Sequence, residues 1–259
     1  MAAISHSRGV HSGPEARHRY RTKRAGLLLA LVPLVATVAF GVLFLADRPT
    51  YLAVVVEDGP VEFATMAVYV VAVVLALVVA RRRAALGDRL GTIAYVLLAA
   101  GFFFIAGEEV TWFQRQLGFA GPEALVERNI QGEANLHNLL GRYALHGAYI
   151  VVGLWGLGLG RVVARFLPFA RPVWLYAPFA HRWTWFFPVT GYYVFIDYVG
   201  PVLVGALGPA LQDIADGPAR FQEPMELLLA FGFALFVLDA LRMTGRPVRS
   251  GGGRPPSRR

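Results

Sequence analysis

Six long apolar runs constrain what this chain can fold into. Crossing about 30 Å of hydrocarbon takes roughly 20 residues of α-helix. The runs lie at about Ala25–Ala46, Glu62–Ala80, Gly91–Gly107, Tyr143–Gly160, Thr184–Ala206 and Pro224–Leu241. We therefore predict an all-α fold, an integral membrane bundle of six transmembrane helices.

The composition agrees with a lipid environment and excludes several kinds of chemistry. Of 259 residues, 56% are hydrophobic and only 16% are charged, whereas an average soluble domain carries about 25% charged residues. The chain has no cysteine, so disulfides, thiolate metal sites and cysteine nucleophiles are excluded.

The domain organisation follows from the apolar runs. Residues 1–24 form a polar, basic tail, residues 25–243 the transmembrane domain, and residues 244–259 an Arg/Gly/Pro-rich tail expected to be disordered. A signal peptide is the alternative for the N-terminal region, but the first apolar run is longer than the 7–15 residues of a signal core. We expect Pro168–Ala180 to lie at the membrane interface, and a short helix at about Pro122–Arg128.

Basic residues mark one face of the membrane. With six spans, 20 of the 25 Lys and Arg residues fall on the side that holds both tails. The positive-inside rule makes that side cytoplasmic, and the basic tails there are expected to meet anionic lipid headgroups. Despite the net charge of +8, no nucleic acid is expected as a partner, because the arginines lie between apolar runs and lack interleaved aromatic residues.

Acidic residues are distributed in the opposite way, since 14 of the 17 lie outside or in the outer half of a span. Carboxylates barely influence membrane insertion, so this segregation indicates a polar layer near the outer surface, centred on a loop at about residues 108–142. Four patches converge on that layer: residues 57–62, 107–115 and 129–138, and Asp197 together with Gln212, Asp213, Glu223 and Glu226.

Two of these patches carry a recurrent motif, Glu-Glu-x-x-Trp-x-Gln-Arg followed by Asn-x-Gln-x-Glu-x-x-Leu-His-Asn. In this motif the chain resembles a family of uncharacterised bacterial polytopic membrane proteins over about Glu57–Asn138. The resemblance implies only a shared architecture and a shared polar motif, and no particular activity. We separately expect a multi-pass protein of the bacterial inner membrane. The motif residues are Glu108, Glu109, Trp112, Gln114, Arg115, Asn129, Gln131, Glu133, Leu136, His137 and Asn138.

A metal site is one interpretation of the outer layer. Glu133 and His137 are four residues apart, which places them on one helical face. Glu109 is the candidate third ligand, with Glu108 as the alternative. A carboxylate with an imidazole suits zinc or another divalent metal. The alternatives are a Glu133–His137 hydrogen bond at a helix start, or acid–base work without a metal.

Other polar residues are candidates for catalysis or substrate binding. Glu109, His146 and Asp197 lie within or beside apolar spans, where an ionisable group is costly and commonly functional. Structural alternatives remain open for these residues: a hydrogen-bonded His146, and an ion pair of Asp197 with Arg142. The candidate substrate-binding residues are Trp112, Arg115, Asn138 and Arg142, of which the arginines suit an anionic group.

Three classes of function therefore stay open. The first is a membrane-embedded enzyme, metal-dependent or acid–base, that acts on a lipid-type substrate from the outer side. The second is a structural or assembly protein whose polar layer locks helices together. The third is an ion- or proton-coupled transporter, which the apolar inner halves of the predicted helices disfavour.

Overall fold

The computed structural model describes residues 14–119, 121–126, 142–166, 178, 180–208 and 221–244. Within these ranges the chain is helical and contains no strand, which confirms the predicted all-α class. Five helical segments are long and apolar enough to cross a membrane. They are Gly26–Ala46 in α1 (Pro14–Ala46), α3 (Pro60–Ala85), α4 (Arg89–Glu109), the continuous segment Phe187–Leu207, and α13 (Gln222–Thr244).

The structure does not form the predicted fourth span as one continuous helix. The span is divided into α7 (Arg142–Gly156) and α8 (Leu159–Phe166). The break falls at Gly158, which has a φ of 101° and sits so close to the Trp183 indole that an added Cβ would lie 2.7 Å from it. At 1.5 Å per residue, the 15 residues of α7 extend about 22 Å, less than the ~30 Å of a full crossing.

Short elements join the long helices. After α1 comes α2 (Arg48–Val54), and α4 is followed by the turn η1 (Thr111–Phe113), α5 (Gln114–Leu117) and α6 (Glu123–Val126). The helix α6 falls within the helix predicted at Pro122–Arg128. The segment Phe187–Leu207 comprises α10 (Phe187–Val194), the π-helical turn η5 (Phe195–Val199) and α11 (Gly200–Leu207), and it is preceded by η4 (Ala180–Trp185).

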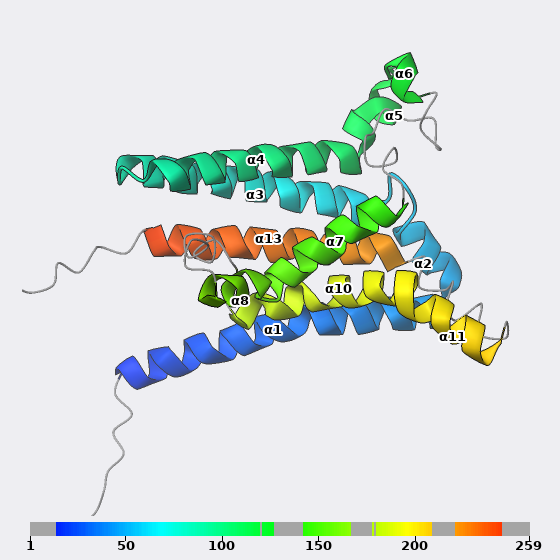
Figure 1. The fold of residues 1–259 in the computed structure, drawn as a ribbon, viewed down its shortest axis with the longest axis horizontal. Coiled ribbons are helices and arrows are strands. Elements are labelled where there is room, and N and C mark those ends of the chain that lie inside the picture. Colours follow the sequence, from blue (N-terminus) through cyan, green and yellow to red (C-terminus); the bar gives the residue numbers. More distant parts are fainter. Residues whose placement is uncertain are drawn as a thin grey trace, which may run out of the picture.

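α13 is the central helix of the bundle. Figure 1 shows α3 and α4 side by side on one side of it, and α1 and α10 on the other, with α7 crossing in front. Its buried residues include Met225, Leu229, Phe233 and Val237, spaced by four residues along one face. Aromatic rings from three helices meet there, with Phe233 5.1 Å from Phe102 and 5.8 Å from Trp155 between ring centroids.

The α3–α4 hairpin is closely packed because small residues recur on its buried faces. Ala72 and Ala76 of α3 and Ala99 and Ala106 of α4 are all buried, and small side chains let helix backbones approach one another. Many large apolar side chains on the outside of the bundle are exposed, such as Leu28, Val35 and Leu97. An outer surface of this kind suits a lipid bilayer.

The polar residues divide between the two ends of the bundle. We call the end where α4 finishes and α3 and α13 begin the acidic end. At the opposite end, where α13 finishes, Arg182 of η4 donates two hydrogen bonds to Asp239, of 2.7 and 2.9 Å. The beginning of α1 and the end of α13 both lie at this opposite end (Figure 1).

Candidate functional site

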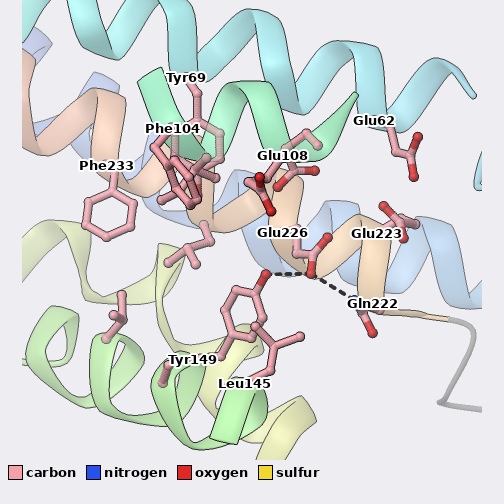
Figure 2. A pocket seen from close by; sticks show the side chains of 15 residues that line it. Glu62, Tyr69, Phe104, Glu108, Leu145, Tyr149, Gln222, Glu223, Glu226 and Phe233 are labelled. Carbon is pink, nitrogen blue, oxygen red and sulfur yellow. Dashed lines mark hydrogen bonds between the residues drawn. The ribbon is translucent and has the colours of Figure 1, made fainter. Parts of the chain in front are cut away.

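A cavity of about 620 Å³ opens near the acidic end between α3, α4, α7 and α13. Its wall is apolar over most of its length and carboxylate-rich towards the acidic end (Figure 2). The lining residues are Glu62 and Tyr69 of α3; Phe104, Ile105, Glu108 and Glu109 of α4; Leu145, Ala148, Tyr149 and Val152 of α7; and Gln222, Glu223, Glu226, Leu229 and Phe233 of α13.

Three of the lining glutamates form a cluster. Glu109, Glu223 and Glu226 each offer a carboxylate oxygen within 4.8 Å of the other two. Glu109 is the last residue of α4, whereas Glu223 and Glu226 are three residues apart near the start of α13, a spacing that puts them on one face. A helix N-terminus favours carboxylates, which explains why α13 can begin with two of them beside a third.

Glu226 accepts hydrogen bonds from two neutral side chains of the cavity wall. The Tyr149 hydroxyl donates a 2.7 Å hydrogen bond to Glu226 Oε1, and the Gln222 amide donates one of 3.0 Å to the same oxygen. These two bonds are drawn in Figure 2. They connect α7 to α13 at the cavity wall and orient the carboxylate.

A second glutamate of α4, Glu108, is held by a tight turn that follows the helix. Thr111, Trp112 and Phe113 all have positive φ values, between 46° and 62°, a conformation that is costly for non-glycine residues. This turn folds Trp112 back onto α4, where the indole Nε1 donates a 2.7 Å hydrogen bond to Glu108 Oε1. Strain of this kind beside a polar cavity is typical of functional sites.

The short helix α5, which follows this turn, is anchored to the loop before α3. Arg115 forms ion pairs with Glu57 at 2.9 Å and Asp58 at 2.8 Å, and the Gln116 amide donates to Asp58 at 2.8 Å. The Asp58 backbone N–H in turn donates to Glu62, which lines the cavity. Trp112 and Arg115, predicted to bind substrate, thus contact acidic residues in this structure: Trp112 contacts Glu108, and Arg115 contacts Glu57 and Asp58.

The cavity is rich in carboxylates. Among the residues that line the cavity in the described part of the chain, five are glutamates and none is Lys, Arg or His. Two carboxylate charges 4 Å apart repel by roughly 4 kcal/mol at an effective dielectric constant of 20. A bound cation or protonation would relieve this repulsion, so the geometry suits a site for a cation or for proton transfer.

His146 and Asp197 form a separate pair. His146 Nδ1 lies 2.8 Å and 3.0 Å from the two Asp197 carboxylate oxygens, and the Asp197 side chain is 2% exposed. Asp197 lies in the π-helical turn η5, which is explained by Pro201 four residues later, because proline offers no N–H to the helix ladder. The structure thus shows the hydrogen-bonded histidine weighed in the sequence analysis, with Asp197 as its partner.

This pair lies behind the cavity wall. The His146 ring is 4.8 Å from the Tyr193 ring, and Tyr193 stacks on Tyr149 at 4.7 Å, so aromatic rings separate the pair from Glu226. His146 and Asp197 are not among the residues that line the cavity. Of the three predicted catalytic residues, only Glu109 lies in its wall.

Several predicted residues lie outside the described part of the chain. These are the predicted metal ligands Glu133 and His137, the predicted substrate-binding residue Asn138, and the side chain of Arg142. The sequence analysis placed Glu223 and Glu226 in the acidic layer but did not assign them to the metal set. Their i, i+3 spacing at the start of an apolar helix was the available signal.

Comparison of the chain with protein-family models, with curated proteins and with solved structures found no match.

Proposed function

We propose that this protein is a membrane-embedded enzyme that binds a divalent cation at Glu109, Glu223 and Glu226 and acts on a lipid-type substrate. The observation that carries the proposal is the approach of three carboxylate oxygens to within 4.8 Å at the polar end of an otherwise apolar cavity. An ion with ligands at 2.0–2.6 Å spans about 4–5 Å between opposite oxygens. The cluster therefore needs little adjustment to hold one.

The donor set favours a hard cation. Carboxylate oxygens suit Mg²⁺, Mn²⁺ or Ca²⁺, whereas imidazole and thiolate ligands are the usual choice of zinc. The three glutamates of the cluster are oxygen donors. We accordingly propose Mg²⁺ or Mn²⁺ at this cluster, whereas the carboxylate and imidazole of Glu133 and His137 suit zinc or another divalent metal.

The chain's own residues would prepare the site for this chemistry. A bound divalent cation supplies polarisation of a substrate oxygen or of water. Tyr149 and Gln222 hold Glu226 in one orientation, as is usual for the partners of metal ligands. Glu62 and Glu108 line the same cavity outside the cluster, where either could accept a proton from a reacting hydroxyl or water.

A one-sided cavity favours an enzyme over a transporter. Tyr69 and Phe233 line the cavity at the end away from the glutamates, and their rings pack 6.5 Å apart. Beyond them the core continues with Tyr95 and Phe236, whose rings stack at 6.4 Å. These aromatic layers close the cavity at the end away from the glutamates. This supports entry of a substrate from the acidic end or from the membrane alone.

A purely structural role is less well supported. Where this protein locks helices with charge, it pairs opposite signs, as in Arg182 and Asp239. The cavity instead gathers five carboxylates, which repel one another when they are ionised. This gathering supports a binding site rather than a device that locks helices together.

The direct test is cation binding by the purified protein. We expect one Mn²⁺ per chain by calorimetry or electron paramagnetic resonance, weakened at least tenfold in Glu109→Gln and in Glu223→Gln. Glu123→Gln, an exposed glutamate on α6, is the matched control and should leave the affinity unchanged. Wild-type protein that binds no Mn²⁺, Mg²⁺ or Ca²⁺ at millimolar concentration would refute the proposal.

A further inference from the structure

The cavity has a mouth on the membrane side of the bundle. Two of its lining residues are exposed, Phe104 of α4, which is 41% exposed, and Ala148 of α7. Phe104 lies five residues before the end of α4 and Ala148 six residues after the start of α7. At 1.5 Å per residue, both lie about 8–9 Å along their helices from the acidic end. The mouth therefore faces lipid rather than only the polar end.

The helices on the two sides of this mouth pack on different neighbours. α4 lies along α3, whereas α7 lies against α10, and α13 runs between the two groups (Figure 1). The cavity follows the face of α13 from Gln222 to Phe233, eleven residues and about 16 Å. A ligand can therefore enter sideways and lie along α13.

The lining changes character along that path. Glu223 and Glu226 mark one end, Leu229 follows, and Phe233 closes the other, with Ile105 and Val152 on the facing helices. A polar head at the cluster and an apolar chain beyond it match this gradient. The volume of about 620 Å³ lies within the range of about 300–1,000 Å³ typical of sites for one small ligand, so it suits one alkyl chain.

We infer that the substrate is a single-chain amphiphile with a phosphate-type head, which enters from the bilayer between Phe104 and Ala148. The inference rests on the proposed function, because carboxylates repel an anionic head unless a cation bridges them. The head lies at the cation held by Glu109, Glu223 and Glu226, and the chain lies towards Leu229 and Phe233. Ala148 is then a gate residue, since its small side chain leaves the mouth open.

The test separates the cation from the amphiphile. The protein, in nanodiscs of zwitterionic lipid, is titrated with Mn²⁺ and then with dodecyl phosphate, with empty nanodiscs as the reference. We expect dodecyl phosphate to bind one per chain and at least tenfold more tightly with Mn²⁺ than without it. Dodecyltrimethylammonium, which has the same chain and a cationic head, should bind at least tenfold more weakly than dodecyl phosphate under the Mn²⁺ condition.

A matched pair of variants tests the mouth. Ala148→Trp should weaken dodecyl phosphate binding at least tenfold and leave the Mn²⁺ affinity unchanged. Val151→Trp, on the exposed face of α7 and outside the cavity lining, should change neither. If Ala148→Trp does not fold, Val152→Trp fills the apolar wall by another route and carries the same expectation.

The outcomes distinguish the two proposals. Two results overturn the inference and leave the proposed function standing, provided that the wild type binds Mn²⁺. The first is equal affinity of the protein for the two amphiphiles. The second is equal affinity of Ala148→Trp and Val151→Trp for dodecyl phosphate. Tighter binding of dodecyltrimethylammonium also overturns it, because the glutamates would then hold a cationic head directly. Absence of Mn²⁺ binding in the wild type overturns both.

Discussion

The Tyr149 hydroxyl and the Glu226 carboxylate, 2.7 Å apart, join α7 to α13 across the wall of the cavity. This bond links a helix that borders the lipid-facing mouth to a carboxylate of the proposed cation site. The position of α7 and the orientation of the Glu226 carboxylate therefore depend on one another.

Tyr149→Phe should weaken cation binding without unfolding the bundle. Loss of a hydrogen bond to a metal-ligating group commonly costs about 10- to 100-fold in metal affinity, and we expect a fall of that size for Mn²⁺, measured by calorimetry. Tyr143→Phe removes a hydroxyl from an exposed position on the same helix and should leave the affinity unchanged. Equal affinities in the two variants would argue against a role for Tyr149 at the site.

Gly107→Ala should dislodge Trp112 from the end of α4. A Cβ at position 107 would lie 2.6 to 2.7 Å from three atoms of the Trp112 ring, too close for both to remain in place. We expect a loss of about 1–3 kcal/mol in stability and a red-shifted tryptophan emission. Gly101→Ala, in the same helix but with open space around it, should be neutral or stabilising by up to about 1 kcal/mol.

The ion pair between Arg182 and Asp239 should matter for folding and not for the site. Both side chains are at most 10% exposed, and removal of one partner from such a pair typically costs about 3–5 kcal/mol. Asp239→Asn should therefore lower the unfolding midpoint in a detergent denaturation series while Mn²⁺ affinity is retained by the folded fraction. Arg242 lies 3.6 Å from Asp239 but is 64% exposed, so Arg242→Gln should cost at most about 1 kcal/mol.

Acid should weaken the turn between α3 and α4 through Asp88. The Gly91 backbone N–H and then the Arg83 guanidinium lower the pKa of Asp88 below its ordinary value. A group whose pKa is lower in the folded state stabilises the fold above its unfolded pKa, about 4, and loses that contribution as the pH falls through the folded pKa. We expect wild type to lose stability between about pH 5 and pH 3.

Asp88→Asn isolates this contribution, because asparagine caps a helix about as well as aspartate but does not ionise. The stability difference between wild type and variant should shrink as the pH falls. A difference that stays constant from pH 6 to pH 3 would exclude Asp88 as its source.

The predicted topology can be tested by labelling, since the chain has no cysteine of its own. We predict that a cysteine at Glu123 reacts with a membrane-impermeant maleimide in intact cells and that one at Ser250 does not. The expectation rests on the basic residues that accompany both tails. The reverse pattern would place the acidic end and its cavity on the cytoplasmic side.

The sequence alone determined the class of fold and the gathering of acidic residues in one layer of the bundle. A long apolar run in lipid must satisfy its backbone hydrogen bonds within the segment, so it forms a helix. The structure agrees, since α3, α4 and α13 contain the runs at Glu62–Ala80, Gly91–Gly107 and Pro224–Leu241. For the fourth span the sequence predicted one continuous helix, whereas the structure has two, α7 and α8. The break depends on the packing of Trp183 against Gly158, a contact between residues that hydropathy treats separately.

The partners of the charged residues were decided only by the tertiary structure. Local spacing linked Glu133 to His137, with Glu109 as a candidate third ligand. Helix packing brings Glu109 within 4.8 Å of Glu223 and Glu226, more than a hundred residues away. His146 and Asp197, 51 residues apart, meet in the same way. A sequence pattern shows which residues share a face of one helix, whereas the crossing of helices determines which faces meet, and that depends on the packing of many side chains at once.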